Sequence, residues 1–427
     1  MTRALPPTLR RRLVRNAAGI ASVCSAHPLV IEAALRHGAA GGRDVLIEAT
    51  CNQVNQDGGY TGMTPAGFRA FVAGIAADVG FPAERLILGG DHLGPNPWKH
   101  LAAHEAMAKA ETMIEAFAAA GFVKLHLDTS MGCAGEPAAL DDDTTATRAA
   151  RLAAAAERAA SDAGAPPPIY VVGTEVPVPG GAFEALDHLE VTAPDAVRRT
   201  LDVHRRAFAD LGLEAAFERA VAVVVQPGVE FGNTEVIAYD PEQARDLSAA
   251  LPDLGDIVFE AHSTDYQTEQ ALAALVGDGF AILKVGPWLT FALREALYGL
   301  DHIAAILDPE ETGERLPEAL ERIMLEAPGH WRKYYPGTPA EQRLQRHFSF
   351  SDRIRYYWPE PEARAAVERL TTRLGDREIP LPLVSQHLGH LYDGVAEGRV
   401  RPVARELLIA SVTRVLALYD RAIGAAL

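Results

Sequence analysis

The feature that most constrains this fold is a unit that repeats eight times along roughly the first 300 residues. In each unit a short apolar run rich in Val, Ile and Leu ends in a polar cluster, and an Ala-rich segment with helical periodicity follows. The runs begin about every 37 residues on average, which is long enough for one strand, one helix and two loops. They are Gly19–Cys24, Val45–Ala49, Leu86–Gly89, Val123–Leu127, Ile169–Val172, Val221–Val225, Ile257–Phe259 and Ala281–Val285.

Continuous apolar runs are typical of strands that are buried on both faces, as in a parallel sheet. Eight such units predict an α/β protein with a (β/α)8 TIM barrel. The main alternative is an open doubly wound sheet, but no G-x-G-x-x-G motif follows the first run. We therefore expect no nucleotide cofactor.

The pattern becomes purely helical after about residue 300. The helical periodicity predicts helices over Leu316–Ala327, Pro361–Leu374 and Arg405–Ala422. We predict a barrel over residues 1–310 and, over residues 311–427, a helical extension that packs on the barrel.

Charge and cysteine content exclude several classes of protein. The 40 basic and 57 acidic side chains give a net charge of −17, which disfavours a broad nucleic-acid interface. The three cysteines are too few and too far apart for a disulfide framework or a C-x-x-C metal motif. Because no run of 18 apolar residues occurs, no membrane span is expected. We predict a cytoplasmic protein without nucleic-acid or membrane partners.

Polar residues gather directly after the apolar runs, where a barrel of this kind carries its active site. Unpaired burial of a charge costs several kcal/mol, so charged groups at these points indicate function. In chain order they are Glu48, Asn52, Gln53, Asn55, Gln56, Asp57, Asp91, His92, Asp128, Thr129, Ser130, Glu175, Gln226, Glu260, His262, Ser263, Thr264, Asp265 and Lys284, with His126 inside the fourth run.

Two histidines are candidate ligands of a divalent metal. His92 follows Asp91 after the third run, where a bend at Gly89 and Gly90 can turn both side chains to one side, with Asp91 as acid or base. His262 follows the seventh run. Each has an alternative interpretation. His92 could be a loop histidine beside Asp91 as a helix N-cap, and the residues after His262 could form a capping box.

Two further residues are candidates to complete the metal site. Glu175 lies on a turn rich in Pro and Gly and completes a site with two imidazoles and one carboxylate, while Gln226 is a weaker candidate. Glu175 could equally be a turn carboxylate that binds backbone N–H groups. The donor set favours Zn²⁺, with Mn²⁺, Co²⁺ or Ni²⁺ as alternatives.

The remaining polar residues suggest a hydroxylated, anionic substrate. Side-chain amides and carboxylates suit a polyol, although they also suit ordered loops. The turn after His262 and two arginines of the extension are candidates for a phosphate clamp, although these arginines could instead pair with surface carboxylates. The substrate-binding candidates are Glu48, Asn52, Gln53, Gln56, Ser263, Thr264, Asp265, Lys284, Arg353 and Arg355.

Seven motifs together resemble one family, the large, non-catalytic subunit of class II D-tagatose-bisphosphate aldolase, over nearly the whole chain. They are Ile47–Gly59, Gly89–Pro95, Leu125–Met131, Gly173–Gly180, Gln226–Gly232, Phe259–Gln267 and Ser351–Trp358. The resemblance implies a (β/α)8 barrel and a role in galactitol, tagatose or aminosugar catabolism. It extends to relatives that epimerise C4 of tagatose-6-phosphate or of ketohexoses. Members are often labelled tagatose-6-phosphate kinase, but this sequence contains no phosphate-cradling kinase loop.

A weaker resemblance reaches the catalytic class II aldolases. Their third strand ends in an Asp-His pair, an acid/base and a zinc ligand, which Asp91 and His92 match; His262 matches a second zinc ligand. Gln226 stands where the remaining zinc histidine is expected, and Lys284 replaces an asparagine after the eighth strand. The resemblance thus implies a metal held by His92, His262 and either Glu175 or Gln226.

Two functions follow from these motifs. The favoured one is metal-dependent C4 epimerisation of a ketohexose or its phosphate by retro-aldol cleavage and re-addition, with Asp91 moving one proton and Asp128 or Glu175 as a second acid or base. The alternative is a non-catalytic partner that stabilises a class II aldolase catalytic subunit. Expected partners are therefore a small ketose and either that subunit or a second copy of this chain. The density of polar groups at the strand ends favours the enzyme.

Overall fold

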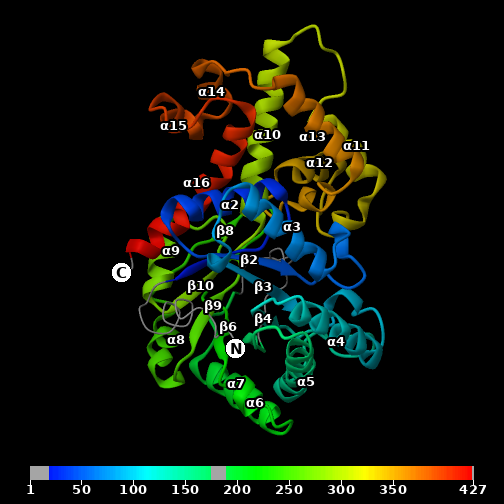
Figure 1. The fold of residues 1–427 in the computed structure, drawn as a ribbon, viewed down its shortest axis with the longest axis vertical. Helices are drawn as coiled ribbons and strands as arrows, with labels where there is room; N and C mark the ends of the chain where they lie inside the picture. The colour runs from blue at the N-terminus through cyan, green and yellow to red at the C-terminus, as the bar shows by residue number, and fades with distance from the viewer. Residues whose placement is uncertain (1–18, 175–188, 426–427) are drawn as a thin grey trace.

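The computed structural model describes residues 19–174 and 189–425. Eight parallel strands close a barrel in the order β1-β10-β9-β6-β5-β4-β3-β2, which confirms the predicted TIM barrel (Figure 1). They are β1 (Ile20–Val23), β2 (Val45–Thr50), β3 (Leu86–Leu93), β4 (Lys124–Leu127), β5 (Ile169–Val172), β6 (Ala220–Val225), β9 (Val258–Ala261) and β10 (Phe280–Val285). Each lies on one of the eight apolar runs of the sequence.

Helices follow the strands and form the outer layer of the barrel (Figure 1). Several begin with a proline or with a side-chain cap, as at Thr64, whose hydroxyl accepts the Gly67 N–H. They are α2 (Pro28–Gly41), α3 (Pro65–Asp78), α4 (Ala103–Ala119), α5 (Asp142–Asp162), α6 (Pro194–Ala209), α8 (Arg245–Ala250), α9 (Glu269–Gly277) and α10 (Pro287–Leu307). A short helix α7 (Glu214–Phe217) and a hairpin of β7 (Glu230–Phe231) and β8 (Val236–Ile237) complete this part.

The chain after α10 is helical, as predicted, and rises beyond one end of the barrel (Figure 1). It contains α11 (Leu316–Glu326), α12 (Pro339–Phe348), the 3-10 helix η7 (Arg353–Tyr357), α13 (Pro361–Leu374), α14 (Leu381–His387), α15 (Tyr392–Ala396) and α16 (Ala404–Ala425). The predicted boundary at residue 310 falls between α10 and α11. Helix α16 returns to the barrel and packs against α2, α9, α10 and strand β1.

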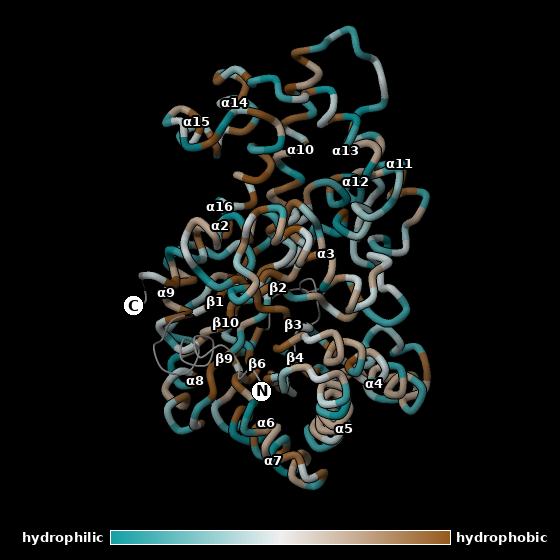
Figure 2. Tube along the Cα trace, viewed as in Figure 1, coloured by the Kyte–Doolittle hydropathy of each residue, from teal (hydrophilic) through white to brown (hydrophobic). Residues whose placement is uncertain are grey.

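The interior of the barrel is layered. Apolar side chains such as Leu46, Val258 and Ile282 form a compact cluster inside the strands, which appear brown in Figure 2. Two positions later along the same strands come Glu48, Glu260 and Lys284, all buried. Because side chains of a strand alternate between its faces, residues two apart face the same way. The apolar layer therefore supports a charged layer at the carboxyl ends of the strands, where active sites of such barrels lie.

Glycine makes room for this charged layer. A Cβ added at Gly89 would overlap the carboxylate of Glu48 on the neighbouring strand.

No helix within residues 19–174 and 189–425 combines the length and the apolarity that crossing a lipid bilayer requires.

Candidate active site

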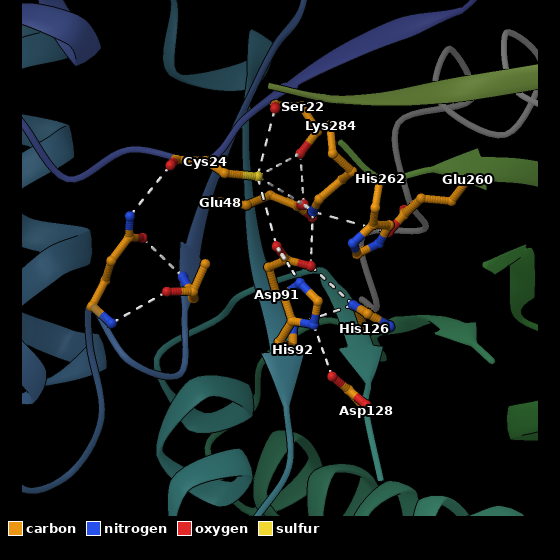
Figure 3. A network of polar contacts seen from close by, with 12 residues as sticks. Ser22, Cys24, Glu48, Asp91, His92, His126, Asp128, Glu260, His262 and Lys284 are labelled. Atoms are coloured by element: carbon orange, nitrogen blue, oxygen red, sulfur yellow. Dashed lines mark hydrogen bonds and ion pairs between the residues drawn. The ribbon is translucent and has the colours of Figure 1, made fainter. Parts of the chain in front are cut away.

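Five buried charged side chains form what we call the floor of the site: Glu48, Asp91, Lys124, Glu260 and Lys284. They come from β2, β3, β4, β9 and β10. Figure 3 shows Glu48, Asp91, Glu260 and Lys284 converging inside the barrel. Lys124 Nζ lies 2.7 Å from Glu48 Oε1 and 2.8 Å from Glu260 Oε2. Lys284 Nζ lies 2.9 Å from Asp91 Oδ1 and also contacts Glu48. The floor is thus one connected network of ion pairs.

Three imidazoles meet directly beside the floor (Figure 3). The ring centroids of His92, His126 and His262 lie 4.8 to 5.1 Å from one another. Each ring has a carboxylate partner. The nitrogen-to-oxygen distances are 2.8 Å for His92 Nδ1 to Asp128 Oδ2, 2.9 Å for His126 Nδ1 to Asp91 Oδ1, and 3.0 Å for His262 Nε2 to Glu260 Oε1. A carboxylate behind each imidazole is the arrangement that orients histidines in metal sites.

His126 is the member of this trio to which the sequence analysis assigned no role. Its side chain is fully buried, and its Nε2 has no hydrogen-bond partner among the described residues. A buried polar atom without a hydrogen-bond partner costs free energy, so we expect this nitrogen to bind a ligand. The sequence feature that could have pointed to His126 is its place inside an apolar run, but a histidine there is equally consistent with a core residue.

The backbone is irregular where Asp91 and His92 enter the site. The pairing of β3 with β4 shifts register between Gly90 and Leu93, and His92 has a positive φ of 49°. The shift brings neighbouring residues of one strand toward the same cavity. The bend expected at Gly89 and Gly90 lies later in the strand, at His92 itself. Ser263, after β9, also has a positive φ, of 54°. Such conformations cluster at functional sites.

The ion pairs set the protonation states of the site. Burial alone would raise the pKa of Asp91, but Lys284, His92 and His126 outweigh it and hold this pKa well below its usual range. Burial lowers the pKa of His262 to about 4, so this imidazole is neutral at pH 7. Burial disfavours charge on His92 too, but Asp91 and Asp128 outweigh it and raise the pKa of His92.

The charges of this layer do not balance. The floor and Asp128 together hold four carboxylates but two ammonium groups, which leaves two negative charges in excess when the imidazoles are neutral. A divalent cation at the imidazoles would cancel that excess. Asp91, His126, Glu260 and His262 each offer a ligand atom within 4.8 Å of the others.

A cavity of about 80 Å³ opens above the floor. Asp91, His92, His262 and Lys284 line its base. The other predicted residues that line it are Asn52, Gln53, Ser263, Asp265 and Arg355. We call Tyr60, Arg355 and Tyr356, which also line this cavity, its rim. The cavity thus joins the strand ends of the barrel to η7 of the helical extension.

Of the two further residues predicted to complete the metal site, Gln226 does not join the imidazoles. Gln226 Oε1 accepts hydrogen bonds from the backbone N–H groups of Gly228 and Val229, at 2.8 and 3.0 Å, and does not line the cavity. Glu175 lies outside the described residues. Asp128 is buried behind His92 and also accepts from the Ser130 hydroxyl at 2.9 Å.

Four predicted substrate-binding residues make contacts outside the cavity. The Gln56 amide donates to the Lys109 carbonyl at 3.1 Å, and the Thr264 hydroxyl to the Lys284 carbonyl at 2.7 Å. The Arg353 guanidinium lies 3.3 Å from the ring centroid of Tyr334. Glu48 is buried in the floor, beneath the cavity.

Asp265 reaches the cavity but also caps a helix. Its Oδ1 accepts from the backbone N–H groups of Gly286 and Trp288, at 3.0 and 2.8 Å, at the start of α10. Burial raises the pKa of Asp265 to about 6. The carboxylate therefore ties the turn after β9 to the turn after β10.

Arg355 is a cation that forms no ion pair with any carboxylate among residues 19–174 and 189–425. It donates to the carbonyls of Ser351 and Asp352 and, at 3.1 Å, to the Tyr356 hydroxyl. Within the described residues, no carboxylate comes within ion-pair distance of Arg355 or Arg353. The alternative that these arginines pair with surface carboxylates thus finds no support in the described part of the chain. A cation at the mouth of a cavity is suited to an anionic ligand.

Comparisons with known proteins agree with this architecture. Residues 7–424 match a family model described as D-tagatose-1,6-bisphosphate aldolase subunit GatZ/KbaZ-like. A curated protein of Agrobacterium fabrum, named D-tagatose 6-phosphate 4-epimerase, is 57% identical over 424 residues, which cover 99% of each chain.

Solved structures share the fold. The crystal structure of a probable tagatose 6 phosphate kinase from Sinorhizobium meliloti 1021 is 60% identical, with a TM-score of 0.88 over 95% of this chain and 100% of that one. The fructuronate-tagaturonate epimerase UxaE from Cohnella laeviribosi has a TM-score of 0.50 at 12% identity, over 94% of this chain and 81% of that one. The second likeness concerns the fold alone.

Proposed function

The chain belongs to the D-tagatose-1,6-bisphosphate aldolase subunit GatZ/KbaZ-like family, and we propose that it is a C4-epimerase of a ketohexose phosphate of the tagatose and fructose type. The observation that carries this proposal is the joint lining of one cavity by Asp91, His92, His262, Lys284 and Arg355. Two imidazoles, a carboxylate and two cations thus line the same small space, which supports roles for them as metal donors, proton acceptor and phosphate ligand. The name of the Agrobacterium relative supports the same reaction.

The donor set fits a divalent metal. His92, His126 and His262 would hold it, because their rings face one another and the Nε2 of His126 has no partner in the described structure. Three imidazole donors suit Zn²⁺, and Mn²⁺, Co²⁺ and Ni²⁺ are the alternatives. When bound, the cation would act as a Lewis acid for the substrate carbonyl.

The residues of the chain divide the chemistry among them. Asp91 is ionised, because its pKa lies well below the usual range, and it accepts the proton of the C4 hydroxyl as the C3–C4 bond breaks. Lys284 stays charged, since burial is outweighed by Asp91 and Glu48 and its pKa lies well above normal. Its charge stabilises the negative charge that develops on the substrate. Asp128 positions the imidazole of His92.

Inversion follows when the C4 aldehyde turns before the bond forms again. The C3–C4 electron pair stays on the ketose fragment and attacks the opposite face of the aldehyde. Arg355 would hold the phosphate of the aldehyde fragment during this rotation, since its guanidinium lines the cavity without a carboxylate partner among the described residues.

Incubation of the purified, metal-analysed protein with tagatose 6-phosphate in deuterated water tests the proposal. We expect fructose 6-phosphate without deuterium at C4, because the C4 hydrogen never leaves carbon. Deuterium at C4 would contradict bond cleavage.

The alternative role is that of a non-catalytic aldolase subunit, which the family description favours. No turnover by this protein alone, together with stimulation of a class II aldolase catalytic subunit, would support that role instead.

A further inference from the structure

We propose that Tyr356 is the second proton-transferring residue of the C4 inversion and serves the carbonyl orientation that Asp91 does not. This inference rests on the proposed function. It assigns to the helical extension a catalytic residue that the barrel does not provide.

The stereochemistry requires two sites of proton transfer. When the aldehyde turns, its oxygen moves to the other side of C4, away from the group that took the first proton. Proton transfer works only within hydrogen-bond reach, at about 2.6 to 3.2 Å between heavy atoms. A carboxylate fixed as Asp91 is, between His126 and Lys284, cannot follow the oxygen to its new position.

Tyr356 approaches the same cavity from a different wall. Asp91 enters at the end of β3, whereas Tyr356 belongs to η7 of the extension. Both side chains line the cavity of about 80 Å³. A space of this size brings a small substrate into contact with both walls at once.

The hydrogen bonds of Tyr356 leave its proton free. Its hydroxyl oxygen accepts from Arg355 Nη2 at 3.1 Å. Because a guanidinium has donors but no acceptor, the proton of Tyr356 is not used in this contact. Within residues 19–174 and 189–425, no acceptor is paired with that proton. The hydroxyl is therefore able to donate to a ligand in the cavity.

The surroundings hold the ring in place and favour loss of its proton. The Tyr60 ring meets it edge-on at 4.8 Å, and the His330 ring stacks on it at 5.0 Å. Burial would raise the pKa of Tyr356, but the cations of Arg355 and Arg353 outweigh burial and lower it. A phenol between two guanidinium groups is a better acid than an isolated tyrosine.

The proton balance closes over one turnover. Asp91 takes the C4 hydroxyl proton of one epimer, and the C3–C4 electron pair moves to C3. After the aldehyde has turned, this pair forms the new C3–C4 bond and Tyr356 gives its proton to the C4 oxygen. Solvent exchange then returns both residues to their starting states. In the reverse direction the Tyr356 phenolate takes the proton and Asp91 gives it.

Tyr356→Phe tests the inference, because it removes the hydroxyl and keeps the ring. In single-turnover, acid-quenched reactions from each epimer, D-glyceraldehyde 3-phosphate is measured beside the epimerised product. We expect epimerisation to fall by about 10²- to 10⁴-fold, while cleavage of one epimer continues at the wild-type rate and cleavage of the other is lost. Tyr357→Phe is the matched control, since its hydroxyl donates to the Ala327 carbonyl and it does not line the cavity.

The outcomes separate the inference from the proposed function. Equal slowing of both cleavages by Tyr356→Phe, or full epimerisation by this variant, would overturn the role of Tyr356. If the wild-type protein itself produces no triose phosphate from either epimer, bond cleavage is wrong and the proposed function falls with it.

Discussion

The floor and the rim of the cavity differ in how their charges are balanced. In the floor, Lys124 and Lys284 each contact carboxylates of neighbouring strands, and every charge has a partner inside the barrel. In the rim, Arg355 donates hydrogen bonds to backbone carbonyls and to the Tyr356 hydroxyl, and it has no carboxylate partner within the described residues. The floor therefore defines its own geometry before any substrate binds, whereas the rim gains its counter-charge from the ligand.

Loss of the imidazole cluster should have the largest effect. His126→Ala and His262→Ala each remove one of three nitrogen donors, so we expect bound metal and turnover to fall to background while the fold remains. Metal analysis and circular dichroism of the purified variants measure this. His100→Ala, at an exposed position, is the control. Wild-type metal content in both site variants would rule out the proposed cluster.

Neutralising Asp91 should affect turnover but not metal binding. Asp91→Asn keeps the shape of the side chain and removes its ability to accept a proton, so we expect a loss of about 10²- to 10⁴-fold in kcat. Bound metal should match the wild-type protein. Full activity in this variant would show that another group accepts the C4 hydroxyl proton.

The floor should contribute to stability in a way that surface pairs do not. Lys124→Met removes one of the two cations that contact both Glu48 and Glu260, and breaking a buried pair costs about 3–5 kcal/mol in the free energy of unfolding. Lys109→Met breaks an exposed pair with Asp57, which contributes about 0–1 kcal/mol. Urea unfolding of the two variants compares these effects. Similar midpoints would mean that the floor tolerates an unpaired charge.

The rim should show the smallest and most selective effect. Charged hydrogen bonds contribute about 1.5–3 kcal/mol, so Arg355→Ala should raise KM for tagatose 6-phosphate by about 10- to 100-fold. KM for free tagatose should change much less. Arg343→Ala, an exposed arginine of α12, is the control. An equal rise for both sugars would place the phosphate elsewhere.

The sequence predicted the barrel well because its signal is local. Each strand of the barrel lies on an apolar run of the sequence, and α13 (Pro361–Leu374) matches the predicted helix residue for residue. Asp91, His92 and His262 were also predictable, because each lies within three residues after an apolar run. The cavity brings these three residues together.

The ion pairs of the floor could not be predicted in the same way, although Glu48, Asp91 and Lys284 were each named as site residues. Lys124, His126 and Glu260 lie inside or at the edge of strands, where the sequence does not say which partner they meet. Their pairing depends on how strands far apart in the chain are placed in the barrel, such as β2 and β10, which both pair with β1 and bring Glu48 to Lys284. The rim was hard to predict for a similar reason, because η7 reaches the cavity only through the packing of the helical extension on the barrel.

The return of α16 to the barrel has a consequence for biosynthesis. This helix lies against β1, α2 and α9, so a segment that covers β1 is synthesised after all eight strands of the barrel. Until the ribosome has released residues 404–425, the apolar face of that strand lacks its cover. β1 therefore lacks its contact with α16 while the rest of the barrel is synthesised, and apolar surface exposed during that interval is prone to aggregation.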